Sequence, residues 1–220
     1  MRIVRLPPRR RVWIFDLDNT LHDASARIFP AMHVQINDYI RRHLGLDEAG
    51  ANALRHVFWQ RYGTTMKGLM RRYGTDPRHF LHETHRFPGI AEMVVSENAL
   101  KHALSRLDGQ KIVFTNAPRR YAEEVLAALG LARWFDAVYT IEDARYRGKP
   151  EPHGFHRLLR LHDLDAHRCA MIDDSLDNLR AAKRLGMSTV WVSRERRATP
   201  HVDLRVASVV DLPRYVFRHA

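Results

Sequence analysis

The sequence predicts an α/β fold built on an open parallel sheet of the Rossmann-like type, and three observations support this prediction. Apolar runs at 12–15, 112–114 and 169–172 are typical of buried strands, and each is followed directly by polar residues. Between these runs, apolar residues recur at three- and four-residue steps, which is typical of amphipathic helices. Strands that alternate with helices favour a parallel sheet, with its ligand crevice at the carboxyl ends of the strands.

The composition indicates a globular, basic chain. It has 220 residues, and Lys plus Arg exceed Asp plus Glu by 36 − 25 = 11, which favours anionic ligands such as phosphate esters or nucleic acid. No apolar run approaches the roughly 20 residues of a membrane-spanning helix, so we expect no membrane association and no secretory signal. The single cysteine, Cys169, excludes an intrachain disulfide and is consistent with the cytoplasm.

The first strand ends in a pair of carboxylates. Asp16 and Asp18 are separated by one residue and follow the apolar run directly, so both lie at the carboxyl end of the strand. Two like charges this close favour a bound cation, and carboxylate oxygens suit Mg²⁺. Taken alone, the segment is equally consistent with an ordinary Asp-Asn-Thr turn.

Residues 21–96 predict a helical insertion. Periodic apolar stretches predict three helices that end before Gly45, Gly63 and Gly74, and Asp76-Pro77 is a typical start for a fourth. A helical bundle inserted at this point is expected to lie over the crevice as a lid, to exclude water and to carry substrate specificity.

Three further segments place polar groups at the ends of core elements. Thr115-Asn116 follows the strand at 111–114 and precedes a helix opened by Pro118, so both side chains and the free helix amides can donate hydrogen bonds to phosphate oxygens. Lys149 lies in the turn Arg147-Gly148-Lys149-Pro150. Asp173-Asp174 repeats the pattern of a buried strand that ends in two acids.

These four segments, in this order, resemble the four motifs of the haloacid dehalogenase superfamily in its phosphatase form. The resemblance implies a core domain made of residues 12–20 and 97–220, with residues 21–96 as its cap domain. It also implies that Asp16 is the nucleophile and that Asp18 is the general acid and base. Lys149 would neutralise charge, and it would bind the phosphoryl group together with Thr115 and Asn116. An acid at position 18 favours phosphoryl transfer over dehalogenation, because a halide leaves without a proton.

The same resemblance implies Mg²⁺ as the cofactor. Its expected ligands are Asp16, Asp18 and one acid of the last pair. Asp174 is favoured as the direct ligand because it precedes the serine, and Asp173 is the alternative, with the other acid orienting water or the lysine.

The insertion resembles the lid of the pyrimidine 5'-nucleotidase branch, through Tyr-Gly-Thr-Thr-Met-Lys-Gly-Leu at 62–69 together with Asp76-Pro77 and Phe87-Pro88. His22 departs from the tyrosine often found at that position in the branch. The resemblance implies UMP, CMP or dTMP as the substrate. Another small ester, such as phosphoglycolate or a sugar phosphate, is the enzymatic alternative.

A non-enzymatic alternative comes from the arginine-rich segment at 1–11. Five arginines are broken by Pro7-Pro8, which argues against a helix and predicts a mobile basic arm. A solvated tail and a nonspecific contact with nucleic acid are both consistent with it. The second reading describes a nucleic-acid-binding protein on an inactive phosphatase fold, and the ordered motifs favour the enzyme over it.

Overall fold

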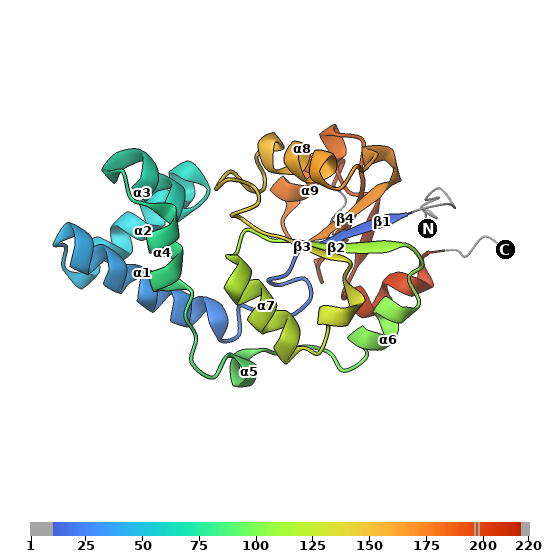
Figure 1. Ribbon diagram of the computed structural model, residues 1–220, viewed down its shortest axis with the longest axis horizontal. Helices are drawn as coiled ribbons and strands as arrows, with labels where there is room; N and C mark the ends of the chain where they lie inside the picture. The colour runs from blue at the N-terminus through green and yellow to red at the C-terminus, as the bar shows by residue number, and fades with distance from the viewer. Residues whose placement is uncertain (1–10, 196, 198, 217–220) are drawn as a thin grey trace. The chain divides into compact units, whose positions relative to one another are not determined.

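The computed structural model describes residues 11–195, 197 and 199–216, which form two compact units (Figure 1). One unit consists of the described residues up to Ala24 and from Val94 onward, and the other is Ser25–Met93. We call them the core unit and the inserted unit. Residues 1–10, which hold most of the predicted basic arm, lie outside the described residues.

The core unit contains one six-stranded sheet in which every neighbouring pair is parallel, which confirms the predicted α/β fold. The strand order is β3-β2-β1-β4-β5-β6. The strands are β1 (Val12–Phe15), β2 (Gln110–Phe114), β3 (Ala137–Tyr139), β4 (Cys169–Asp173), β5 (Ser188–Val192) and β6 (Leu204–Val206).

The strand order reverses between β1 and β4, and this reversal positions the site. After β1 the chain adds β2 and β3 on one side, then crosses to the other side for β4, β5 and β6. Phe15 lies opposite both Val113 and Ile172, so the residues that follow these strands meet at one edge of the sheet. In open α/β sheets this switch point is where ligands bind.

Helices cover both faces of the sheet, with α8 and α9 on one face and α6 and α7 on the other (Figure 1). A buried cluster joins the first of these faces to the sheet, and Phe114 contacts Tyr139 and Phe155 edge to face at centroid distances of 5.1 and 5.2 Å. The helices are α6 (Leu100–Ser105), α7 (Arg119–Ala128), α8 (Pro152–Leu161) and α9 (Leu176–Arg184), with short 3₁₀ helices at Ala132–Trp134, Ala166–Arg168 and Val209–Arg214.

The inserted unit is helical, as the sequence predicts. Its helices are α1 (Ile28–Leu44), α2 (Glu48–Tyr62), α3 (Thr65–Tyr73), α4 (Pro77–Thr84) and the short α5 (Ile90–Met93). The side chains of Asp47, Thr64 and Asp76 cap α2, α3 and α4 by accepting hydrogen bonds from backbone amides at their first turns.

Three local details depend on contacts or on short segments. β3 ends at Tyr139, because Thr140 turns the chain and donates its amide and hydroxyl to Asp143. The helix Val209–Arg214 is 3₁₀ and contains Pro213, which has no amide hydrogen to donate. Helix α5 is not predicted, because four residues are too few to show a periodic pattern.

The chain passes from the core unit to the inserted unit between Ala24 and Ser25, and it returns between Met93 and Val94. These limits lie a few residues from the predicted ones at 20/21 and 96/97. Leu21, His22 and Ala24 are buried, and the amide of Asp23 donates to the carbonyl of Val95 at 2.8 Å. Residues 21–24 are therefore built into the core unit. Within the described part of the chain, no helix is long and apolar enough to cross a membrane.

Candidate active site

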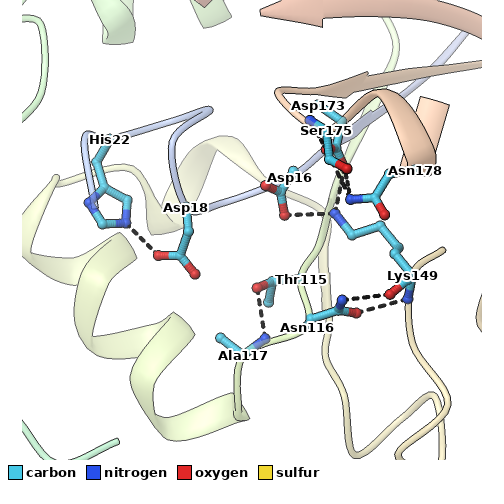
Figure 2. A network of polar contacts seen from close by, with 10 residues as sticks. All are labelled: Asp16, Asp18, His22, Thr115, Asn116, Ala117, Lys149, Asp173, Ser175 and Asn178. Atoms are coloured by element: carbon cyan, nitrogen blue, oxygen red, sulfur yellow. Dashed lines mark hydrogen bonds and ion pairs between the residues drawn. The ribbon is translucent and has the colours of Figure 1, made fainter. Parts of the chain in front are cut away.

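The carboxyl edge of β1 and β4 holds a buried lysine between two aspartates (Figure 2). Asp16 follows β1 directly, and its amide donates to the carbonyl of Ile172, which ties it to the end of β4. Lys149 Nζ lies 2.6 Å from Asp16 Oδ1 and 2.7 Å from Asp173 Oδ2. The lysine side chain is 1% exposed, so the ion pairs are shielded from water.

Electrostatics at this site depend on burial and on the balance of charge. Burial raises the pKa of Asp16, an effect that Lys149 opposes and that the neighbouring carboxylates reinforce. Burial alone lowers the pKa of Lys149, but the attraction of Asp16 and Asp173 outweighs it, so the pKa of the lysine is raised. Lys149 therefore remains an ammonium. The pKa of Asp16 is raised despite this lysine, so a further positive charge beside Asp16 would favour its ionised form.

The two acids that end β4 have different surroundings. The carboxylate of Asp173 accepts hydrogen bonds from Ser175 N at 2.8 Å and from Asn178 Nδ2 at 3.0 Å, in addition to Lys149. Asp174 hydrogen-bonds none of these groups, and burial, reinforced by Asp173, raises its pKa to about 6. Asp173 is thus committed to holding the lysine, and Asp174 is the better placed of the two to bind a cation.

The donor set fits a hard divalent cation. Oxygens of Asp16, Asp173 and Asp174 lie within 4.8 Å of one another, and the site holds one ammonium against several carboxylates. All three of these acids offer carboxylate oxygens, which are the ligands that Mg²⁺ prefers. Asp18, the fourth acid expected among the ligands, is not in this group, because its carboxylate accepts hydrogen bonds from His22 and Tyr121.

Asn116 joins the end of β2 to the lysine turn. Its Nδ2 donates to the carbonyl of Lys149 and its Oδ1 accepts from the amide of Lys149, both at 2.8 Å. The position before the lysine must be glycine, because a Cβ at Gly148 would collide with Asn116 Oδ1. Both ends of this amide therefore hold the lysine turn, and Nδ2 keeps a second hydrogen beyond the one that it donates to the carbonyl of Lys149.

Thr115 lies where the sequence predicts it, at the end of β2, and is 1% exposed. Its Oγ1 accepts a hydrogen bond from the amide of Ala117 at 3.0 Å, so the hydroxyl hydrogen can be donated elsewhere. The predicted hydrogen bond from Thr115 to a phosphoryl oxygen is therefore compatible with this geometry.

Sequence reasoning missed the surroundings of Asp18. His22 Nε2 lies 2.9 Å from Asp18 Oδ1, and Tyr121 donates its hydroxyl hydrogen to the same oxygen at 2.5 Å. His22 is buried, and its ring lies beside the carboxylate of Asp18. Tyr121 lies in the first turn of α7, directly after the Thr115 segment, and that position was the one available signal for it.

The fold and the clustered acids define a class of hydrolase, and the comparisons with known proteins agree. Residues 11–186, which contain all the site residues described above, match the family of haloacid dehalogenase-like hydrolases. The protein belongs to this family.

Named relatives are about a quarter identical to this chain over the aligned residues. Phosphate metabolism protein 8 of Saccharomyces cerevisiae is 26% identical over 200 residues, which cover 83% of this chain but 61% of the yeast protein. Phosphoglycolate phosphatase of Mesorhizobium japonicum is 25% identical over 209 residues, covering 83% of this chain and 82% of the relative. A 5'-nucleotidase of Pseudomonas aeruginosa is 27% identical over 195 residues, covering 81% and 80%. The relatives support a hydrolase of the phosphatase type.

A solved structure with the same fold is that of a HAD phosphatase from Thermococcus onnurineus. It superposes with a TM-score of 0.67 at 21% sequence identity, covering 93% of this chain and 96% of that one. The likeness confirms the family fold.

Proposed function

We propose that this protein is a Mg²⁺-dependent phosphomonoesterase that acts through an aspartyl-phosphate on Asp16. The observation that carries the proposal is the buried ammonium of Lys149, fixed between Asp16 and Asp173 beside a third carboxylate. An anionic nucleophile can approach an anionic phosphate only where positive charge is concentrated. Asp18 is held by other partners and is available for proton transfer.

The first half-reaction transfers the phosphoryl group to the protein. A carboxylate oxygen of Asp16 attacks phosphorus, and the bond from phosphorus to the ester oxygen breaks. Asp18 donates a proton to the leaving ester oxygen, which departs as an alcohol. Thr115 donates a hydrogen bond to a phosphoryl oxygen, and Lys149 neutralises charge shared between Asp16 and the phosphoryl group.

The second half-reaction regenerates Asp16. A water molecule attacks the phosphorus of the aspartyl-phosphate, and Asp18, now a carboxylate, takes its proton. The bond from phosphorus to Asp16 breaks and inorganic phosphate leaves. One residue thus serves as acid and then as base.

Asp16 and Asp174 are the residues that would hold Mg²⁺, while Asp173 orients the lysine. The ion would supply electrophilic charge beside the phosphate. It would also offset the effects that raise the pKa of Asp16, which are burial first and the neighbouring carboxylates second.

The raised pKa of Asp174 predicts that Mg²⁺ stabilises the protein in a pH-dependent way. The protonated carboxyl favours the folded state below its ordinary pKa of 3.8, and this contribution is lost as the pH rises through about 6. Only the ionised form binds Mg²⁺ well, so millimolar Mg²⁺ should raise the melting temperature at about pH 8 and much less at about pH 5. Thermal unfolding measures this effect, and Asp174→Asn should abolish the increase. Equal increases at both pH values would refute the assignment.

For the substrate, we propose a pyrimidine nucleoside monophosphate. The support comes from the segment at 62–69 of the inserted unit and from the 5'-nucleotidase among the relatives. Phosphoglycolate or a sugar phosphate is the alternative, and the phosphoglycolate phosphatase relative supports it. The single cysteine, buried Cys169, supports a cytoplasmic location.

Phosphate release with Mg²⁺ tests the substrate on a panel of UMP, CMP, dTMP, AMP, phosphoglycolate and glucose 6-phosphate. We expect kcat/KM for the pyrimidine monophosphates to exceed that for AMP by at least about 10-fold. This is the discrimination that a pocket achieves when two substrates differ slightly in their fit. Higher kcat/KM for phosphoglycolate or glucose 6-phosphate would retain the phosphatase and reject the nucleotidase. Release from none of the six would reject both.

A further inference from the structure

Asp18 receives two hydrogen bonds on one carboxylate oxygen. His22 Nε2 lies 2.9 Å from Oδ1, and the hydroxyl of Tyr121 donates to Oδ1 at 2.5 Å. Because a carboxylate only accepts, Nε2 of His22 carries the hydrogen in this contact. Within the described residues, Oδ2 accepts no hydrogen bond. The two oxygens of Asp18 are therefore not equivalent.

Two separate parts of the core unit bring these donors to Asp18. The loop after β1 folds back on itself: the amide of Leu21 donates to the carbonyl of Leu17, Asn19 adopts a φ of 60°, and Asp18 forms a backbone bridge with His22. This turn places the His22 ring beside the carboxylate (Figure 2). Tyr121 comes from α7, 103 residues further along the chain.

Stability alone does not explain the histidine at position 22. His22 is 4% exposed and Tyr121 is 0% exposed, and within the described residues His22 Nδ1 is buried with no hydrogen-bond partner. A buried polar atom without a partner costs about 1–3 kcal/mol, whereas an apolar side chain would fill the same space without that cost. The arrangement is therefore better explained by what it does to Asp18.

The hydroxyl of Tyr121 is a dependable donor. Burial, followed by the charge of Asp18, raises the pKa of Tyr121, so the phenol keeps its proton throughout the range in which enzymes work. Its α7 backbone is packed in the core, where Ala122 and Val125 are also buried. The direction of this hydrogen bond is thus fixed.

We propose that His22 and Tyr121 are positioning residues that hold Asp18 Oδ1, so that Oδ2 alone exchanges the proton with the leaving group and with the attacking water. This inference rests on the proposed phosphatase mechanism. A carboxylate free to rotate would present either oxygen in many orientations, and a misplacement of about 1 Å can cost 10²-fold in rate.

The role predicts a dependence on the leaving group that a purely structural role would lack. Benzyl phosphate and p-nitrophenyl phosphate are similar in size, but a benzyl alkoxide needs a proton to leave and a p-nitrophenolate does not. Because kcat/KM reports the steps up to the first irreversible one, it isolates the transfer to Asp16 in which Asp18 acts as the acid. Misplacing Asp18 should therefore slow the benzyl ester selectively.

Four variants make the test. Tyr121→Phe removes one hydroxyl, and His22→Leu removes the other donor. His22→Gln is the conservative variant, because its amide nitrogen can reach the position of Nε2. Tyr139→Phe is the matched control: this tyrosine is also fully buried in the core unit, but its hydroxyl donates to the carbonyl of Gly154.

We expect Tyr121→Phe and His22→Leu to lower kcat/KM for benzyl phosphate by about 10- to 100-fold, a part of the 10²–10⁴ that general acid catalysis supplies. The loss for p-nitrophenyl phosphate should stay below about 3-fold, because that step needs little acid. His22→Gln should recover most of the loss, and Tyr139→Phe should treat the two esters alike.

Equal losses on both esters, or no loss on either, would overturn the positioning role. The isosteric Tyr121→Phe keeps the test decisive if His22→Leu fails to fold, as judged by thermal unfolding. Two other results would reject the proposed function itself. In one, the wild-type protein releases no Mg²⁺-dependent phosphate from either ester; in the other, Asp16→Asn releases phosphate as fast as the wild-type protein.

Discussion

Asp16→Asn is expected to abolish phosphate release while the protein remains folded. The amide is nearly the same size as the carboxylate, but it is a poor nucleophile and cannot form the aspartyl-phosphate, so kcat should fall by at least about 10³-fold. The substitution removes one of the two carboxylates that pair with Lys149, but Asp173 stays within 2.7 Å of the lysine. The metal-free protein should therefore keep a cooperative thermal unfolding transition.

The control for this experiment is Asp163→Asn. Asp163 is exposed, and its φ of 50° is a backbone conformation that asparagine tolerates well. It changes the net charge equally and should leave turnover intact. Near-normal turnover in a folded Asp16→Asn protein would exclude the covalent mechanism, and mass spectrometry of the quenched wild-type protein should detect the phosphorylated Asp16 peptide.

Lys149→Met is expected to affect both catalysis and stability. It removes the ammonium that lies between Asp16 and Asp173 and leaves those carboxylates buried without their cationic partner. Breaking a buried ion pair by removing one member costs about 3–5 kcal/mol of unfolding free energy. Loss of the charge beside the phosphoryl group should lower kcat/KM by at least about 10²-fold, as for the loss of one preorganised donor.

Denaturant unfolding without metal measures the stability term. Lys183→Met is the matched control, because Lys183 pairs with Asp203 at 2.5 Å but its side chain is 39% exposed. Loss of that exposed pair should cost less than about 1 kcal/mol. If the two variants lose the same stability, the buried network does not hold the site together as described.

Most of the fold could be predicted because its signals are local. The strands that meet at the site are short apolar runs, and helices α1 to α3 end at glycines in the left-handed conformation, at φ values of 68°, 83° and 65°. The end of β3 could not be predicted in the same way. It depends on the hydrogen bonds that the amide and hydroxyl of Thr140 donate to Asp143, which turn the chain out of the strand.

The candidate site could be predicted in its components but not in its pairings. Carboxylates at the ends of two apolar runs indicate which edge of the sheet they share, and the structure brings Asp16 and Asp173 together through Lys149. The use of Asn116 to hold the lysine turn and of Tyr121 to hold Asp18 involves contacts 33 and 103 residues apart. Neither the composition nor the spacing of the sequence encodes such contacts.

The segment that suggested a pyrimidine substrate has structural roles of its own. Gly63 ends α2 in the left-handed conformation, Thr64 caps α3 through the amide of Lys67, and a Cβ at Gly68 would collide with the ring of Phe58. A helical hairpin needs these residues whatever the substrate. The segment therefore predicts the inserted helices more directly than the ligand, which is why the substrate panel is needed.

The distance along the chain between Asp16 and its lysine also bears on how the protein folds. The two residues are 133 positions apart, and β1 pairs in parallel with β2 and β4, each of which follows a long intervening segment. Parallel pairing over such separations loses the entropy of closing a large loop before the stabilising contacts form. Folding steps of this kind are therefore intrinsically slow. The helices of the inserted unit, by contrast, rely on near neighbours in sequence. A nascent chain cannot bring Asp16, Lys149 and Asp173 together until β4 has been synthesised, so the candidate site is assembled only when the centre of the sheet is complete.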